Sequence, residues 1–285
     1  MDIHRTKSDM RAARAGLARD GATIGLVPTM GFLHGGHMAL VERARAECDR
    51  VVVSIFVNPT QFGPGEDYEA YPRDTDRDLA MLRDAGVDAV FLPDAAEIYP
   101  EDAETVVEPA RLSRILIGRL RPGHFAGVAT IVTKLFNIVG PDAAFFGEKD
   151  YQQLRVIRRV VRDLDMPVRV EGVEIVREAD GLAMSSRNVR LSEDHRRAAP
   201  VLHAALEVGR AAIEAGEGVT AAGERVRRRL EEARDAQVQS VDLRDAATLQ
   251  PLRGTPDRPV VMLLAVRFGD VLLIDNMVAI PKEAA

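Results

Sequence analysis

The sequence predicts an α/β fold in which a parallel sheet is covered by helices on both faces. Short apolar runs alternate with helical patterns through the first half of the 285 residues. The runs are almost continuously apolar, as is typical of strands that are buried on both faces. Such alternation of strands and helices indicates a parallel sheet. The expected strands are residues 23–27, 51–57, 89–92 and 143–146, and the expected helices are residues 38–47, 74–84, 128–139 and 151–163.

The pattern changes near residue 176, and the remainder predicts a smaller α+β domain. A strand at residues 168–176 should lead into a polar turn, two charged helices and three strands. We therefore expect a first domain at residues 1–176 and a second at residues 177–285. Within the second domain we expect the polar turn at 177–188, helices at 193–215 and 220–236, and strands at 238–243, 260–266 and 271–274, the last two joined by a turn at 268–270.

The composition is that of an ordinary globular protein of enzyme size. Hydrophobic residues make up 46% and charged residues 29%, and the formal net charge of −6 argues against nucleic acid as a general partner. The single cysteine, Cys48, excludes a disulfide framework within one chain. No apolar run is long enough for a membrane span, and the N-terminal residues lack the apolar stretch of a signal peptide. We expect a cytoplasmic protein without a membrane partner.

The most informative segment lies between the first expected strand and the first expected helix. Residues 28–37 read Pro-Thr-Met-Gly-Phe-Leu-His-Gly-Gly-His, so that His34 and His37 share one face of the first helical turn. A helix N-terminus favours phosphate because its first N–H groups are unpaired and its dipole end is positive. Two imidazoles beside it would add donors to phosphate oxygens. The alternative is a glycine-rich turn with two surface histidines.

Polar side chains follow two further expected strands. Asn58 and Gln61 come after the second strand, and their amides suit the hydroxyls and carboxylate of a small ligand. The alternative is a Pro/Gly turn whose polar groups satisfy its own backbone. After the fourth strand, Lys149 could place an ammonium beside phosphates, with Gln153 on the same helix face as Asp150. Asp150 could equally be only a helix N-cap, and the glycine spacing is not that of a P-loop.

A fourth polar group lies at the start of the second domain. Ser185, Ser186 and Arg187 could bind a triphosphate, because the guanidinium fork matches phosphate oxygens. The alternative is a serine-rich linker between domains. His124, in a polar loop before a helix, could contact a phosphate or carboxylate, or be a surface histidine.

Together these segments resemble the pantothenate synthetase family in order and spacing. The resemblance rests on residues 28–37, 58–64, 147–153 and 184–188, with further similarity at 67–73, at 121–127 and around Val176. It covers most of the first 195 residues. It implies a Rossmann-like nucleotide-binding domain of the nucleotidyltransferase type, with a His-x-Gly-His signature, followed by a smaller domain that acts as a lid.

The resemblance also implies an activity and a set of site residues. The expected enzyme is an ATP-dependent ligase that joins (R)-pantoate to β-alanine through a pantoyl adenylate, releasing AMP and pyrophosphate. The family is typically a homodimer and uses Mg²⁺ with ATP. The implied catalytic residues are His37 (the acid), His34, Lys149 and Arg187. Pantoate and β-alanine are assigned to Gln61, Gln153 and Asn58. The implied ATP-binding residues are Met30, Gly31, Phe32, Leu33, His34, Gly35, Gly36, His37, Gly147, Glu148, Lys149, Asp150, Val176, Met184, Ser185, Ser186 and Arg187.

Two alternative functions remain open, and the residues that bind Mg²⁺ are not identified. A nucleotidyltransferase acting on a phosphate-bearing substrate would share the histidine signature but would not need both Gln61 and Gln153. A nucleotide-binding module without catalysis would not need all of the phosphate-facing groups. The protein ligands of Mg²⁺ are not identified by the sequence; Asp74, Asp76 and Asp78 are candidates because they are acidic and follow the Gln61 loop.

Overall fold

The protein contains two compact units, of which unit 1 is Met1–Ile175 and unit 2 begins at Val176. The structure is a computed structural model and describes residues 1–282. Unit 1 is built on a six-stranded sheet in the order β1-β4-β3-β2-β5-β6, in which every neighbouring pair is parallel. The strands are β1 Asp2–His4, β2 Ile24–Thr29, β3 Arg50–Ile55, β4 Ala89–Phe91, β5 Ala143–Gly147 and β6 Arg169–Val173.

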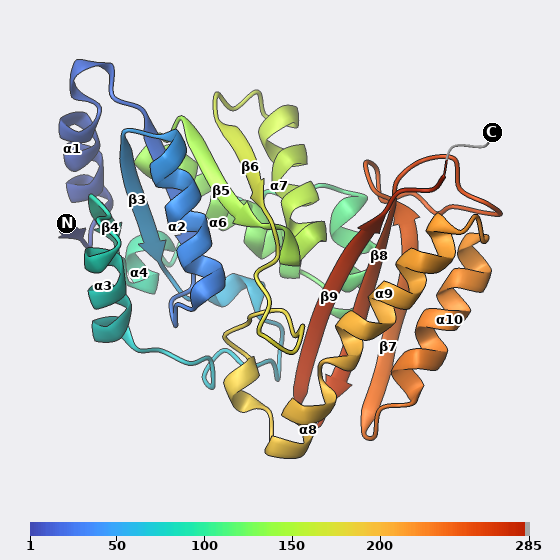
Figure 1. Ribbon diagram of the computed structural model, residues 1–285. Coiled ribbons are helices and arrows are strands. Elements are labelled where there is room, and N and C mark those ends of the chain that lie inside the picture. The colour runs from blue at the N-terminus through green and yellow to red at the C-terminus, as the bar shows by residue number, and fades with distance from the viewer. Residues whose placement is uncertain (283–285) are drawn as a thin grey trace. The chain divides into compact units, whose positions relative to one another are not determined.

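Helices cover both faces of this sheet, as the alternating pattern predicted (Figure 1). One core joins α2 and α3 to the sheet through residues such as Leu40, Leu82 and Phe145. The other joins α1, α6 and α7 to the opposite face through residues such as Met10 and Leu154. The helices of unit 1 are α1 Lys7–Leu17, α2 Gly35–Glu47, α3 Thr75–Asp84, α4 Ala95–Ile98, α5 Ile117–Leu120, α6 His124–Val139 and α7 Tyr151–Asp163, with 3₁₀ turns at Arg19–Gly21, Pro59–Gln61, Leu112–Arg114 and Glu148–Asp150.

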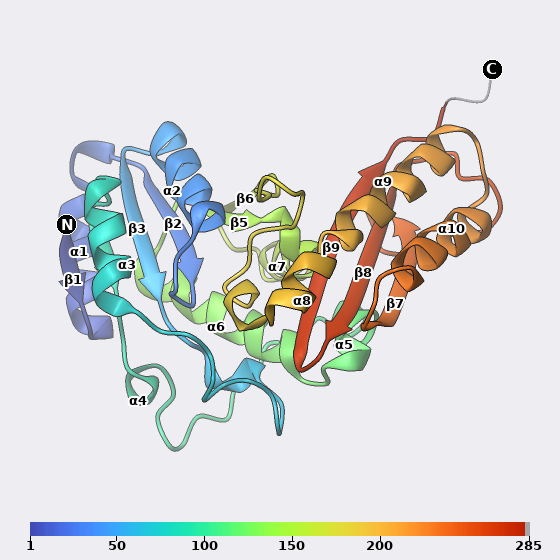
Figure 2. The ribbon, with the colours of Figure 1, turned by 60° about the horizontal axis from the view of Figure 1, so that its bottom comes forward.

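The strand order places the expected site motifs at one edge of the sheet. β2 lies between β3 and β5, and all three run in the same direction, as Figure 2 shows for β2 and β3. From β2 the chain winds through β3 and β4 towards one side of the sheet and then returns to β5 and β6 on the other side. The order therefore switches beside β2. In open parallel sheets, ligands bind outside the carboxyl ends of the strands at this switch point.

Unit 2 is a small α+β structure. Its antiparallel sheet has the order β7-β8-β9, with β7 Ala236–Asp245, β8 Val260–Phe268 and β9 Val271–Ala279. The expected turn between the last two strands is confirmed, and Gly269 in it has a φ of 56°. The helices are α8 Glu193–Ala198, α9 Val201–Glu214 and α10 Val219–Glu231, and a 3₁₀ turn spans Asn188–Arg190. α9 and α10 share one hydrophobic core with the sheet.

Several expected boundaries differ from the structure. The single helix expected at residues 193–215 is wrong, because α8 ends at Ala198 and α9 begins after Pro200. Proline lacks a backbone N–H and its ring clashes with the preceding turn, so a helix does not pass through it unbroken. The strand expected at 168–176 ends at Val173, and the one expected at 271–274 continues to Ala279.

Candidate active site

The turn from β2 into α2 holds the two histidines in a reciprocal cap. His34 is the N-cap of α2, and its Nδ1 accepts from the N–H of Gly36 at 3.1 Å. The N–H of His34 in turn donates to Nδ1 of His37 at 3.3 Å, and the ring centroids are 4.1 Å apart. Because Nδ1 of each ring accepts a hydrogen bond, each neutral ring carries its proton on Nε2. Both histidines therefore have their donor on the nitrogen that the cap does not use.

His37 is neutral at physiological pH in this environment. Burial, followed by the neighbouring His34 and the charge of Lys149, lowers the pKa of His37 from 6.5 to about 3. Both histidines are half-buried and use Nδ1 in the cap, which favours the predicted site over two free surface histidines. A neutral imidazole donates a hydrogen bond through Nε2–H without carrying a charge of its own. An anion bound beside it would favour the protonated form.

The end of β3 presents Gln61 from a buried amide network. Gln61 lies in the 3₁₀ turn Pro59–Gln61 and is 8% exposed. Asn58 donates through Nδ2 to Oε1 of Gln61 at 3.1 Å and to the carbonyl of Gly127 at 3.2 Å. Oδ1 of Asn58 accepts from the hydroxyls of Tyr99 at 2.8 Å and Thr60 at 3.0 Å. The hydrogen-bonding groups of Asn58 are thus occupied within the protein, and the residue orients the Gln61 amide.

A second set of contacts holds the backbone of Gln61. Nε2 of His124 lies 3.3 Å from a guanidinium nitrogen of Arg121, which can only donate, so the neutral ring carries its proton on Nδ1. Nδ1 then donates to the carbonyl of Gln61 at 2.9 Å. Arg121 also pairs with both carboxylate oxygens of Glu66, at 2.8 and 2.5 Å. His124 is therefore not a surface histidine, and burial with the charge of Arg121 lowers its pKa to about 4.

The end of β5 supplies the expected cation. Lys149 is half-buried, with its ammonium 3.8 Å from the Asp150 carboxylate, and its charge contributes to the lowered pKa of His37. Asp150 occupies the N-cap position of α7, but its side chain makes no capping hydrogen bond. Gln153 is half-buried on the first turn of that helix.

The neighbouring Gln152 has a different role from Gln153. Gln152 is 4% exposed and binds the backbone of the segment before α5, donating to the carbonyls of Leu112 at 2.9 Å and Ile115 at 2.8 Å. Its Oε1 accepts from the N–H of Ile117 at 3.1 Å. Gln152 thus fixes the backbone of the segment before α5, and sequence reasoning had no signal by which to separate its role from that of Gln153.

Two of the three acidic residues that are candidate Mg²⁺ ligands accept hydrogen bonds from backbone N–H groups. Asp74 caps α3 by accepting from the N–H of Arg77 at 3.2 Å, and Asp78 accepts two backbone N–H groups. Asp76 is exposed on the first turn of α3. Within residues 1–282, no group of three His, Cys, Asp or Glu side chains could hold a metal ion. The assignment of Mg²⁺ to any of these three carboxylates therefore stays a prediction.

The predicted site residues of unit 2 lie in a hydrogen-bonded turn. The N–H of Met184 donates to the carbonyl of Val176 at 3.0 Å, and Arg177 pairs with Ala183 across a tight bend. Arg177 binds both oxygens of the buried Asp275, at 2.7 and 3.0 Å. The N–H of Arg187 donates to the hydroxyl of Ser185 at 3.3 Å, and Ser186 is 6% exposed. These contacts contradict the alternative of a plain linker.

The predicted residues thus fall into two groups. His34, His37, Gln61, Lys149 and Gln153 belong to unit 1, where they follow the ends of the adjacent strands β3, β2 and β5. So do the other residues assigned to ATP in the first domain, namely Met30, Gly31, Phe32, Leu33, Gly35, Gly36, Gly147, Glu148 and Asp150. Val176, Met184, Ser185, Ser186 and Arg187 belong to unit 2.

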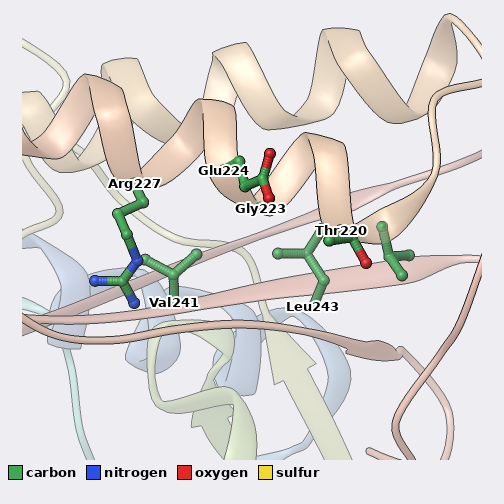
Figure 3. A pocket seen from close by; sticks show the side chains of 7 residues that line it. Thr220, Gly223, Glu224, Arg227, Val241 and Leu243 are labelled. Atoms are coloured by element: carbon green, nitrogen blue, oxygen red, sulfur yellow. The ribbon is translucent and has the colours of Figure 1, made fainter.

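A hollow elsewhere in unit 2 has different chemistry. It measures about 250 Å³ and lies between α10 and β7, where it is lined by Glu224, Arg227, Val241 and Leu243 among others (Figure 3). None of the residues expected to bind ATP, pantoate or β-alanine lines it. This hollow is therefore separate from the residues of the predicted active site.

Comparison with known proteins identifies relatives over nearly the whole chain. The model of the family described as pantoate-beta-alanine ligase matches residues 2–278. The pantothenate synthetase of Rhizobium meliloti (strain 1021) is 54% identical, over 98% of this chain and 96% of its own length. That of Bartonella henselae is 50% identical, over 98% of both chains.

Solved structures agree with these sequence relatives. The pantothenate synthetase of Thermus thermophilus is 48% identical, with a TM-score of 0.92 over 97% of this chain and 99% of its own. The pantoate-beta-alanine ligase of Francisella tularensis, solved as a complex with β,γ-ATP and β-alanine, is 33% identical, with a TM-score of 0.81 over 97% of both chains. In the part of the chain that the structure describes, no helix is long and apolar enough to cross a membrane.

Proposed function

Because the chain belongs to the pantoate–β-alanine ligase family, we propose that it condenses (R)-pantoate with β-alanine, using ATP, to give pantothenate, AMP and pyrophosphate. The family match over residues 2–278 carries this conclusion and makes the chain an ATP-dependent ligase. The geometry of unit 1 supports it independently. A pair of imidazoles, a lysine and a buried glutamine follow three adjacent parallel strands.

The chemistry requires activation of the acid before the amide forms. A carboxylate is a poor acylating agent, so an oxygen of pantoate attacks the α-phosphorus of ATP and pyrophosphate leaves. The amine of β-alanine then attacks the acyl carbon of the pantoyl adenylate. AMP departs with the electron pair of the broken acyl–oxygen bond, and the amine loses a proton. Negative charge grows on phosphate oxygens in the first step, where preorganised donors are most effective.

The residues of unit 1 divide these tasks between phosphate and acid. We assign the Nε2–H groups of His34 and His37 and the ammonium of Lys149 to the phosphates. The lowered pKa of His37 supports a role as a neutral donor when no anion is bound. Gln61 and Gln153 are assigned to pantoate, with Gln61 also near β-alanine. Asn58, predicted to bind substrate, is better supported as the residue that orients Gln61.

The residues of unit 2 are assigned to the triphosphate. Arg187 can donate to two phosphate oxygens at once, and Ser185 and Ser186 add hydroxyls. With Val176 and Met184 they would complete the ATP site when unit 2 acts as a lid. Closure of this kind would shield the adenylate from water.

The remaining assignments concern the metal and the assembly. Mg²⁺ commonly binds through substrate phosphates and keeps several waters. We therefore assign Mg²⁺ to the phosphates of ATP, where it would neutralise phosphate charge. Homodimerisation and a cytoplasmic location complete the proposal. Light scattering of the purified protein, with twice the 31.2 kDa chain mass expected, tests the dimer.

One experiment tests the proposed reaction. Protein, ATP, Mg²⁺, pantoate and β-alanine are mixed, and pantothenate is sought by mass spectrometry. A second mixture without β-alanine should give a burst of about one pyrophosphate per site and then slow down. A nucleotidyltransferase acting on a phosphate-bearing substrate would release no AMP that depends on β-alanine. Absence of pantothenate in the complete mixture would refute the ligase assignment.

A further inference from the structure

The loop between β2 and α2 has a backbone that needs outside support. Gly31 and Phe32 have φ angles of 79° and 52°, so two successive residues are left-handed. This region is unfavourable for a bulky residue such as Phe32 and persists only where surrounding contacts hold it. A Cβ on Gly31 would lie 3.0 Å from both Oδ2 of Asp78 and Cγ2 of Ile55, so the loop also passes close to α3 and β3. The source of its support is therefore α3.

Asp78 supplies the first contacts. Its two carboxylate oxygens accept from successive backbone N–H groups, those of Phe32 at 2.7 Å and Leu33 at 2.8 Å. Successive N–H groups beside left-handed residues form a concavity that binds anions. Asp78 is 1% exposed, and burial raises the pKa of its carboxyl group. The two backbone N–H groups oppose this shift, because they stabilise the charged form.

Arg77 holds the same two residues from the solvent side. Its guanidinium donates to the carbonyl of Leu33 at 2.8 Å and lies 5.3 Å from the centroid of the Phe32 ring. Consecutive residues of α3 thus bind both N–H groups, one carbonyl and one aromatic face of a single dipeptide. We name these four contacts the α3 clamp.

The α3 clamp acts directly on the cap that orients the histidines. Leu33 precedes His34, whose backbone N–H donates to Nδ1 of His37. We propose that Arg77 and Asp78 are positioning residues that fix the Phe32–Leu33 backbone, and through it the His34 and His37 pair, in the geometry that ATP requires. This inference rests on the proposed function, in which that pair meets the phosphates. Neither residue is assigned a contact with ATP.

The test compares Asp78→Asn with a matched variant at the other end of the same strand. The carboxamide keeps the volume of Asp78 but turns an NH₂ group towards one backbone N–H. Asp142 is the control, since its Oδ2 accepts from the N–H of Ile24, the first residue of β2, at 2.7 Å. We expect Asp78→Asn to raise the KM or the calorimetric Kd for ATP about 10–100-fold, the scale of a lost charge-assisted bond. The KM for pantoate should stay within about twofold, and Asp142→Asn should leave both unchanged.

Arg77→Ala provides a second variant that is safe for folding, because this side chain is exposed. It should weaken ATP binding in the same selective way. In the double variant Arg77→Ala/Asp78→Asn, the Kd for ATP should rise by less than the product of the two single fold-changes, because both side chains act on one dipeptide. Amide exchange at Phe32 and Leu33 should quicken in Asp78→Asn and not in Asp142→Asn.

Defined results overturn the proposal. An unchanged affinity for ATP in folded Asp78→Asn or Arg77→Ala would overturn it. An equal loss of affinity for ATP and for pantoate would also overturn it. If Asp78→Asn does not fold, Arg77→Ala alone decides. Failure of the proposed function is recognised separately, since wild-type protein would then form no pantothenate. The calorimetric comparison of ATP binding would still test the clamp.

Discussion

One nitrogen of the His37 ring belongs to the helix cap, and the other is the group that we propose donates to ATP. This division makes the two roles separable by substitution. In His37→Asn the side-chain oxygen can replace Nδ1 as the acceptor for the His34 N–H, but the Nε2–H donor is lost. The adenylation rate should fall roughly 10²–10³-fold, the scale for removing one transition-state donor. The thermal midpoint should stay close to that of wild type.

Two companion variants complete this comparison. His37→Gln places an amide N–H near the position of Nε2 and should recover part of the rate while losing the cap. His37→Ala removes both and should lose the rate together with about 0.5–2 kcal/mol of stability, the usual range for a lost N-cap. Pyrophosphate release and urea unfolding measure the two effects. A wild-type rate in His37→Asn would contradict the proposed role of Nε2–H.

The lowered pKa values of His37 and His124 also predict how stability depends on pH. Both values, about 3 and about 4, lie below the value of 6.5 expected for the unfolded chain. Above pH 6.5 both states are neutral at these residues, and their contribution is fully present. As the pH falls below 6.5, the unfolded state takes up protons that the folded state does not. Stability is therefore lost, by at most about 1.4 kcal/mol per pH unit for each histidine.

Urea unfolding at pH 7 and pH 5 measures this loss. The double variant His37→Asn/His124→Asn removes both titrating rings, and the asparagine at 124 can still donate to the Gln61 carbonyl. Between pH 7 and pH 5, the free energy of unfolding should fall by about 2–4 kcal/mol more in wild type than in the double variant. An equal loss in both proteins would show that these histidines do not have depressed pKa values in the folded chain.

Single residues differ in how far their roles could be predicted from sequence. The chemistry of His34 and His37 is local, since their three-residue spacing at a helix start creates the cap. Asp78 was a candidate metal ligand because it is acidic and follows the Gln61 loop. Its contacts with Phe32 and Leu33 had no sequence signal, because these residues lie about 45 positions earlier in the chain. Glu66 gave no signal at all, because only folding brings it to Arg121. Contacts between residues far apart in the sequence depend on the order of the strands in the sheet, and local sequence patterns do not predict that order.

Among the elements of unit 1, too, local features could be predicted from the sequence and long-range pairing could not. The apolar runs at β2, β3 and β5 predicted buried strands, and their order in the sheet came only from the structure. β1 was missed because its three residues, Asp2–His4, contain no apolar run and it is recognised by pairing with β4. By contrast, the break between α8 and α9 had a signal in the sequence, Pro200, which the helical charge pattern obscured.

The packing of α6 against the 3₁₀ turn of Gln61 gives a prediction at the element scale. A Cβ on Gly127 would lie 2.7 Å from Cα of Gln61 and closer still to the carbonyl of Thr60. Since these neighbours are backbone atoms, Gly127→Ala must move the turn and the Gln61 amide with it. The KM for pantoate should rise at least about 10-fold, the scale of a lost substrate hydrogen bond, while the Kd for ATP changes little.

Gly16→Ala is the matched control for this helix glycine. Nothing lies within 4 Å of a Cβ at Gly16 in α1, so alanine should be neutral or stabilising there. Calorimetry with pantoate and with ATP separates the two ligands. An unchanged pantoate affinity in Gly127→Ala would mean that Gln61 does not hold this substrate.

At the scale of the whole molecule, the residues that we assign to ATP are divided between the two units. His34, His37 and Lys149 belong to unit 1, and Ser185, Ser186 and Arg187 belong to unit 2. The turn that carries Arg187 is braced inside unit 2, where Asn188 donates to Glu178 at 3.0 Å and to the carbonyl of Ala183 at 3.1 Å. These contacts fix the conformation of this turn within unit 2. A ligand favours a closed state only through contacts that it makes better there.

This reasoning predicts that ATP with Mg²⁺ slows amide exchange across residues 181–189 of wild-type protein. The triphosphate supplies the charge that Arg187 and the two serines would meet, so protection should require ATP and should be absent with pantoate alone. Arg187→Ala should remove most of it, and Arg187→Lys should restore it only in part, because an ammonium cannot make the two-pronged contact. The strands β2 and β5 serve as the internal control, since their exchange should be the same in all three proteins. Equal exchange of residues 181–189 with and without ATP would remove Arg187 from the proposed site and leave unit 2 without a role in closure.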